Sequence, residues 1–152
     1  MEQQDVPAYT VTSPQGRLSA EQKQQIAAGI TRVHCEITGA PVFFVQVMFN
    51  DVPDGNYFRG GKILRDTDNV YVHGRIRAGR DSATKERLLL GLMQAVAAAA
   101  GVEEHCLQVY LVEVPARQIA EFGRILPVPG EEAAWWEAMP ADLRARIEAG
   151  EA

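Results

Sequence analysis

Cysteine and histidine are scarce in this sequence, which has two of the first and three of the second among its 152 residues. Cys35 and Cys106 share no short spacing with other metal-ligand residues, and the adjacent His34 and His105 complete no recognised zinc motif. We therefore expect a reduced protein with two buried thiols and no metal. Nothing in the sequence indicates a cofactor either.

Long apolar runs and a basic leader are also missing. No stretch approaches the roughly 18 apolar residues of a membrane span, and a secretory signal is not apparent. Gly60, Gly61 and Lys62 do not complete a phosphate loop of the GxxxxGK[ST] type. The net charge of −5 disfavours a general nucleic-acid binder, so any function of positive charge must be local. We expect a cytoplasmic protein that acts without nucleic acid or membrane.

The residues present, 47% of them hydrophobic and 23% charged, suffice for one globular domain with a substantial core. After a cap at Ser19, a first helix is indicated by apolar residues at helical spacing, namely Ile26, Ile30, Val33 and Ile37. A second helix is predicted from Ser82 to Ala100. The segments with strand character are 8–12, 42–49, 70–76 and 107–114.

This order predicts an α+β fold of two tandem β-α-β units, an α/β-type organisation. Strands joined through a helix should be parallel, because the crossover returns the chain to the same end of the sheet. The expected product is a small, mostly parallel sheet with both helices on one face. Its other face would be bare, and since segment 42–49 is strongly apolar, we expect an oligomer that buries sheet against sheet.

The C-terminal third is less regular. Residues 114–125 are predicted to form a short helical turn, and the chain from Glu131 onward to be irregular before a last amphipathic helix. Trp135 and Trp136 either pack across a neighbouring subunit or cap the core locally.

Three arginines, Arg75, Arg77 and Arg80, fall close together at the end of the strand 70–76. Guanidinium groups suit a bound carboxylate or phosphate. A solvated basic edge that blocks strand pairing explains the cluster equally well.

Three other residues are unspecific one by one: His34 fits a half-buried core position, Tyr110 a strand aromatic, and Glu121 a surface carboxylate. Their order and spacing are more specific. With PAYTVT, ITRVH, FRGG, VYVHGRIRAGR and QVYLVEVPARQIAEFGRILPVPG, the sequence resembles the cis-3-chloroacrylic acid dehalogenase family of the tautomerase superfamily over residues 7 to about 138. The resemblance implies a homotrimer of β-α-β-α-β subunits.

The resemblance also implies the site residues, because the family's functional side chains match Pro7, His34, Arg77, Arg80, Tyr110 and Glu121. Arg75 has no counterpart and is expected to lie at the surface or behind the site. The domain organisation implied is an N-terminal extension or mis-assigned start at 1–6, a tautomerase-like domain at 7–138, and a C-terminal tail at 139–152.

These residue types together suit the hydration of a small 3-haloacrylate. Arg77 and Arg80, helped by His34, would hold the carboxylate and make the β-carbon electrophilic. Glu121, with a hydrogen bond from Tyr110, would orient and deprotonate water. A protonated proline amine would give its proton to the α-carbon, and loss of halide would leave malonate semialdehyde.

Pro7 is the decisive position, because an N-terminal proline carries an amine that transfers protons, whereas an internal proline is an amide. With Glu121 close, the amine suits an acid; dominated by the arginines, it suits a base for keto–enol tautomerisation. MEQQDV precedes Pro7 here, and Glu2 disfavours removal of Met1. Since a GTG valine codon can serve as a bacterial start, our leading hypothesis begins the native chain at Val6, read as methionine and then removed.

Two main functions stay open at this point. The first is an enzyme that hydrates small unsaturated carboxylates, or tautomerises enols, with an N-terminal proline. The second is a non-catalytic or amine-independent trimer that binds small carboxylates because Pro7 is not N-terminal. A purely structural trimer would leave the matched pocket residues unexplained.

Overall fold

The computed structural model describes residues 7–65 and 68–152, so the predicted extension 1–6 lies outside the described residues. The strands are β1 (Ala8–Pro14), β2 (Gln46–Val52), β3 (Phe58–Arg59), β4 (Lys62–Ile63), β5 (Val70–Arg77), β6 (Leu107–Val114), β7 (Ala120–Glu121) and β8 (Arg124–Ile125). The α-helices are α1 (Ala20–Thr38), α2 (Ser82–Ala100), α3 (Glu132–Glu137) and α4 (Ala141–Glu148).

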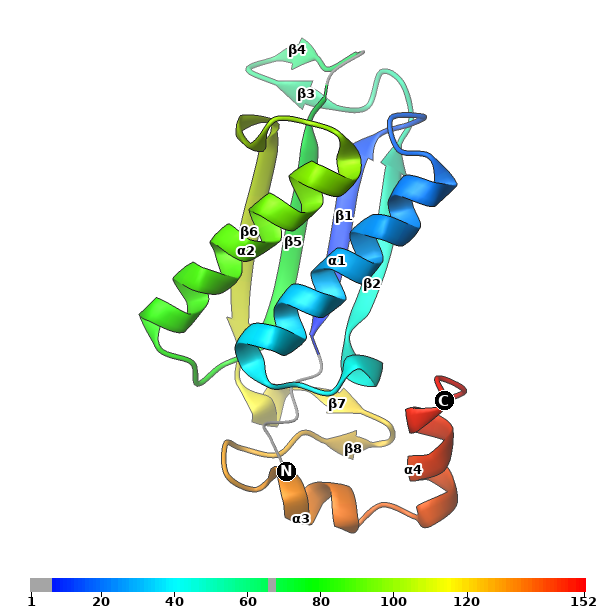
Figure 1. The fold of residues 1–152 in the computed structure, drawn as a ribbon, viewed down its shortest axis with the longest axis vertical. Helices are drawn as coiled ribbons and strands as arrows, with labels where there is room; N and C mark the ends of the chain where they lie inside the picture. The colour runs from blue at the N-terminus through cyan, green and yellow to red at the C-terminus, as the bar shows by residue number, and fades with distance from the viewer. Residues whose placement is uncertain (1–6, 66–67) are drawn as a thin grey trace.

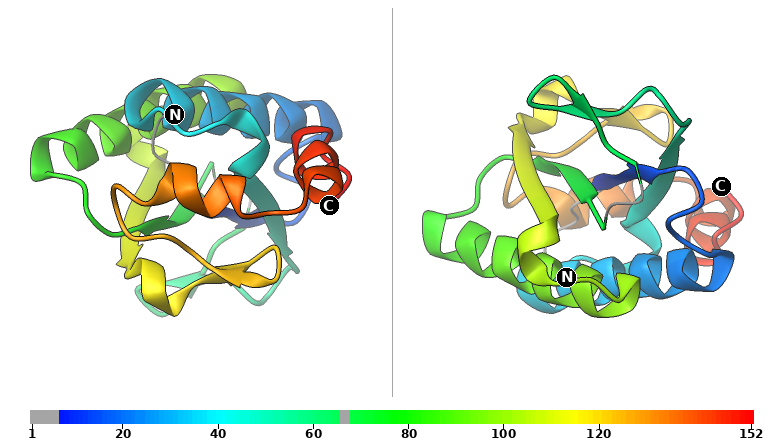
Figure 2. Two further views of the ribbon diagram at one scale, coloured as in Figure 1. Left: turned by 90° about the horizontal axis from the view of Figure 1, so that it is seen from below. Right: turned by 90° about the horizontal axis from the view of Figure 1, so that it is seen from above.

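Four strands form the central sheet in the order β2-β1-β5-β6. β1 runs parallel to β2 and β5 runs parallel to β6, each pair being joined through a helix, whereas β1 and β5 are antiparallel. The two long helices lie side by side on one face of the sheet (Figures 1 and 2). The predicted pair of β-α-β units, the mostly parallel sheet and the one-sided helix layer are confirmed.

The ends of both long helices are set by local capping groups. Ser19 and Gln22 form a capping box at the start of α1, which ends at Gly39 in the left-handed conformation. Asp81 accepts a 2.7 Å hydrogen bond from the Thr84 amide at the start of α2. Gly101 ends that helix, so its predicted bounds are confirmed. Within the described ranges, no helix combines the length and apolarity needed to cross a membrane.

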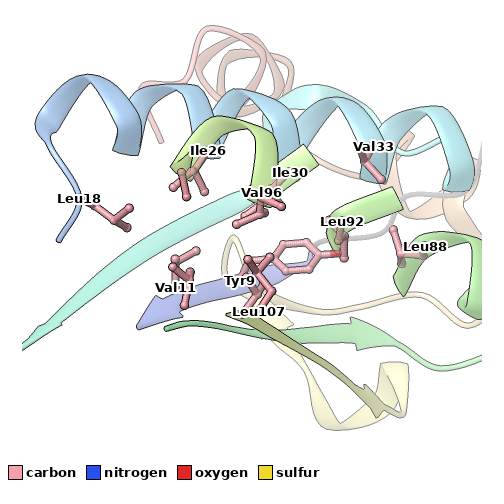
Figure 3. Packing of buried hydrophobic residues seen from close by; sticks show 14 of the residues in the cluster. Tyr9, Val11, Leu18, Ile26, Ile30, Val33, Leu88, Leu92, Val96 and Leu107 are labelled. Carbon is pink, nitrogen blue, oxygen red and sulfur yellow. The ribbon is translucent and has the colours of Figure 1, made fainter. Parts of the chain in front are cut away.

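The main core lies between the sheet and the two helices. Figure 3 shows Tyr9 and Val11 of β1 pointing toward the helix layer. The predicted stripe of α1 supplies Ile26, Ile30 and Val33 to this cluster, and α2 supplies Leu88, Leu92 and Val96. The alternating burial of β1 shows that only one face of the strand is sealed by helices.

The predicted buried strand 42–49 is wrong in its first half. Val42–Phe44 form a 3-10 turn in which Phe44 is 1% exposed and Val42 is 63% exposed, and the strand begins only at Gln46. Phe44 leaves the strand direction because it packs into a second apolar cluster. Met48 lies on the open face of this edge strand between Gln46 and Asn50, the residues two positions before and after it, so the face is mixed rather than uniformly apolar.

The second apolar cluster is separate from the main core and is built largely from the C-terminal part of the chain. Its buried members are Phe44, Ala116, Leu126, Trp136, Met139 and Ile147. The predicted helical turn at 114–125 is a 3-10 turn followed by the β7–β8 hairpin, and the chain from Glu131 onward holds two helices. Trp136 stacks on Phe43 of the same chain, with ring centroids 5.9 Å apart, so it caps the core locally. Figure 1 shows α3 and α4 at this end of the molecule.

We expect Gly74→Ala to destabilise the protein by about 1–3 kcal/mol, because overpacking a filled core forces neighbours to move. A Cβ at Gly74 would lie 2.5 Å from Cε1 of Tyr9 and 3.0 Å from Cδ2 of Leu111. Urea denaturation measures the loss.

Gly29→Ala is the matched control. Its Cβ would meet Cβ of Ala95 at an ordinary 3.5 Å, and removing a glycine from the interior of α1 should add about 0.5–1 kcal/mol. Equal stability of Gly74→Ala and the wild-type protein would contradict the tight packing of Tyr9 on β5.

Candidate active site

Of the residues predicted to form a site, all except Tyr110 lie toward the end of the sheet where β1 begins and β5 and β6 end. Antiparallel pairing places Ala8 opposite Arg75, while parallel pairing places it beside Gln46. Pro7, which precedes Ala8, is buried, and its carbonyl accepts a 3.0 Å hydrogen bond from the Gln46 amide. The first described residue of the chain therefore lies at the same edge as the arginine cluster.

A pocket of about 300 Å³ opens at this edge, a size suited to a small ligand. It is lined by Ala8, Arg75, Val114, Gln118, Ile119, Ala120 and Glu121. Glu121 and Arg75 are its two charged lining residues. A carboxylate and a guanidinium thus face one small space beside the start of β1.

Glu121 is positioned by a tight hairpin. Phe122 and Gly123 both have positive φ, 53° and 75°, as a two-residue type I′ turn requires. Phe122 is strained by this conformation and is held by Phe44, with ring centroids 5.9 Å apart. The hairpin pairs the backbone of Glu121 with that of Arg124 and so places Glu121 at the pocket wall.

His34 comes to this end of the sheet on the last turns of α1. It is fully buried, and its Nδ1 lies 2.7 Å from the Tyr9 hydroxyl in a hydrogen bond. The two rings meet edge to face, at 75° and 5.6 Å. Tyr9 follows Pro7 by two residues, so His34 is oriented by the same strand that positions the proline.

Arg77 is buried and tied to the C-terminal segment. Its side chain is 2% exposed; Nη1 donates to the Pro127 carbonyl at 2.8 Å and Nη2 donates to Oε1 of Glu132 at 2.9 Å. Arg80 is half-buried and donates from Nη1 to the Arg77 carbonyl at 3.3 Å. Sequence reasoning missed Glu132 because it lies 55 residues from Arg77, and no local pattern pairs the two.

The Glu132 carboxylate is held in its charged form. Burial alone would raise its pKa, but hydrogen bonds from its own backbone amide, from Arg77 and from Gly130 outweigh burial and lower the pKa below the usual range. The Gly130 amide lies 2.8 Å from Oε2. Both oxygens of the carboxylate are therefore used to hold the β5 end and the 127–132 segment together.

Tyr110 lies away from this pocket in the single chain. It is 58% exposed in the middle of β6, where its ring meets Tyr71 edge to face at 5.2 Å. It does not line the pocket that holds Glu121. The chain thus brings Pro7, the arginines and Glu121 to one edge and leaves Tyr110 on the open face of the sheet.

The cysteines lie outside this site. Cys35 and Cys106 are free cysteines. Both are only partly buried, so the expectation of two buried thiols is wrong. Burial, followed by the charge of Glu36, raises the pKa of the Cys35 thiol and disfavours a reactive thiolate. Over residues 7–65 and 68–152, no three His, Cys, Asp or Glu side chains are grouped to hold a metal ion.

Similar proteins share this architecture. Residues 6–139 match the family described as "Putative oxalocrotonate tautomerase enzyme". The crystal structure of N1, a member of the cis-3-chloroacrylic acid dehalogenase family, is 32% identical in sequence, covers 93% of this chain and 99% of that one, and superposes with a TM-score of 0.87. The chain is a cis-3-chloroacrylic acid dehalogenase-like member of the tautomerase superfamily.

Other superfamily members match over a shorter stretch or at lower identity. "Probable tautomerase SpyM3_0797" of Streptococcus pyogenes serotype M3 is 38% identical over 58 residues, which are 38% of this chain and 93% of that protein. The R7 fused 4-OT wild type asymmetric trimer is 26% identical, covers 84% of this chain and 98% of its own, and has a TM-score of 0.71. The sequence resemblance to the superfamily is confirmed.

We expect Glu132→Gln to lower the free energy of unfolding by about 3 kcal/mol, because removing one partner of a buried ion pair leaves the other charge uncompensated. Glu137→Gln, in the same helix, is the matched control, since the Glu137 side chain in its 3.4 Å ion pair with Arg144 is 70% exposed and the pair should be worth under about 1 kcal/mol. Urea denaturation at neutral pH compares them. Equal effects would contradict a structural role for the buried pair.

The ion pair between Arg77 and Glu132 should also make the free energy of unfolding depend on pH. A carboxyl with a lowered native pKa contributes its full stability above the unfolded value, about 4.3, and loses it as pH falls through the native pKa. The difference in free energy of unfolding between wild type and Glu132→Gln should therefore be largest near neutral pH and become smaller below about pH 4. Denaturation across this range measures it, and a gap that does not change with pH would count against the lowered pKa.

Proposed function

We propose that this protein hydrates small unsaturated carboxylates, 3-haloacrylates among them, in a form whose chain begins at Pro7. The observation that carries the proposal is the meeting of the start of β1, the arginine-bearing end of β5 and Glu121 around one small pocket. Membership of a tautomerase superfamily supports enzyme chemistry at this place.

Glu121 serves as the base in this proposal. Its carboxylate accepts a proton from water, and the water oxygen bonds to the β-carbon of the acid. The Pro7 amine, in its protonated form, gives a proton to the α-carbon. With a 3-haloacrylate, the halogen and the new hydroxyl then share one carbon, and loss of hydrogen halide gives malonate semialdehyde.

Charged and polar donors make the β-carbon electrophilic by holding the substrate carboxylate. Arg80 is half-buried and bound to the Arg77 carbonyl at the end of β5, and the charge of Arg77 is already paired with Glu132. If the Tyr9 hydroxyl donates to Nδ1 of His34, the imidazole is neutral with its proton on Nε2, where it acts as a donor. The histidine then binds without adding charge.

A homotrimer completes the proposal for Tyr110. This side chain is exposed on the open face and lies outside its own chain's pocket. It can assist a Glu121 only across a subunit contact, which would also cover the mixed open face of the sheet. The solved fused 4-OT trimer supports such an assembly.

An amine-independent carboxylate-binding trimer is the second candidate. The observation that favours it is chemical, since with Val6 bonded to it, the Pro7 nitrogen is an amide and has no proton to give. The pocket with Glu121 and Arg75 would remain in that case, and it would bind acids without proline catalysis.

We expect a chain beginning at Pro7 to convert cis-3-chloroacrylate to malonate semialdehyde at least about 100-fold faster than the full chain, because a positioned general acid contributes that much or more. Product formation is measured for both chains, and the intact mass of the protein made from its own gene shows which form the cell contains. Pro7→Ala, begun at that residue, retains a primary amine and controls for chain length. Equal rates for the two proline chains would refute the amine mechanism.

A further inference from the structure

Arg75 is the charged pocket residue to which the family resemblance gives no role. It lies on β5 directly opposite Ala8 and two residues before Arg77, so both arginine side chains leave the sheet on the face away from the helices. Arg75 is exposed and lines the pocket across from Glu121, whereas Arg77 is absent from the lining. The strand pleat and the register therefore point Arg75 into the space where a substrate would bind.

The charge of Arg77 is already matched within the chain. Its guanidinium forms the buried 2.9 Å ion pair with Glu132 and a 2.8 Å hydrogen bond to Pro127. A substrate carboxylate would have to share this cation with Glu132, and two carboxylates around one guanidinium repel each other. Arg77 is therefore poorly placed to supply net positive potential to an incoming anion.

The positive charge of Arg80 is also partly offset by a neighbouring carboxylate. Glu113 lies close enough for the Arg80 charge to contribute to its lowered pKa, after the larger effects of the Lys85 hydrogen bond and the Gly79 amide. Within residues 7–65 and 68–152, Arg75 by contrast forms no ion pair.

We propose that Arg75 is the anion-recognising residue of this pocket and determines its preference for carboxylates over neutral analogues. Its planar guanidinium donates two parallel hydrogen bonds to the carboxylate, a geometry that an amide cannot match with the same charge. Arg77 and Glu132 hold the strand end in place behind it. The inference rests on the proposed function for the reacting pocket, but binding tests it without any turnover.

The test uses the full chain with crotonate, a small unsaturated acid, and crotonamide, its neutral counterpart, titrated in a calorimeter. We expect saturable crotonate binding by the wild-type protein, with crotonamide at least about tenfold weaker, as charge-assisted hydrogen bonds imply. Arg75→Gln should weaken crotonate about tenfold and erase the difference between the two ligands. Arg75→Lys should restore part of it through charge alone.

Arg32→Gln is the matched control, because Arg32 pairs with Glu36 on the outer surface of α1 and takes no part in the pocket. It should leave both affinities unchanged. Thermal unfolding should be unaltered in Arg75→Gln, since the side chain is exposed. Crotonate binding by Arg75→Gln equal to that of the wild type would overturn the inference, as would a wild-type protein that binds no crotonate.

Turnover separates this inference from the proposed function. Arg75-dependent binding without conversion of any acid would support the anion site and refute the hydratase. Conversion with a KM unchanged by Arg75→Gln would support the hydratase and refute the anion site. A raised KM with a nearly constant kcat would support both.

Discussion

The buried ion pair between Arg77 and Glu132 is the contact on which the site end of this molecule depends. A guanidinium that is 2% exposed needs a carboxylate within reach, because an unpaired charge in that position would be strongly destabilising. The pair joins the last residue of β5 to the first turn of α3. The C-terminal segment is thereby an integral part of the fold, and its loss would expose a charge as well as an apolar surface.

That connection extends to the pocket through aromatic packing. Helix α3 carries Trp136 onto Phe44, and Phe44 in turn holds Phe122, the strained residue of the hairpin turn. Glu121 precedes this turn, so its position follows from the second apolar cluster rather than from the main sheet. The ion pair holds α3 in place. The apolar cluster then connects α3 through Phe44 to the hairpin that carries Glu121. A matched motif therefore identifies Arg77 but does not show that its charge is available to a ligand.

Local signals predicted the parts of the fold that depend on nearby residues. The second helix was predicted with its true bounds, because Gly101 directly follows its last residue and ends it. The segment 42–49 was predicted as one strand because its β-branched and aromatic residues suit a strand. Phe44 instead packs against Trp136, which lies 92 residues later in the chain, and the first half of the segment forms a turn. The same limit applies to the site. The arginine cluster is visible in the sequence, and the family resemblance identifies Glu121, which lines the pocket. The partners Tyr9 for His34 and Glu132 for Arg77 are set by tertiary contacts that no local pattern encodes.

The tandem architecture runs the first strands of the two β-α-β units, β1 and β5, in opposite directions. In the second β-α-β unit, Asn69 stands where Pro7 stands in the first, directly before the strand. Because β1 and β5 are antiparallel, these two positions lie at opposite ends of the sheet. Asn69 is buried there between Arg59 and Tyr57, with hydrogen bonds of 2.9 and 2.7 Å. An internal residue can never present an α-amine, so the Asn69 position supplies only a neutral amide. The second unit contributes to the site instead through the arginines that β5 delivers to the end of the sheet where β1 begins.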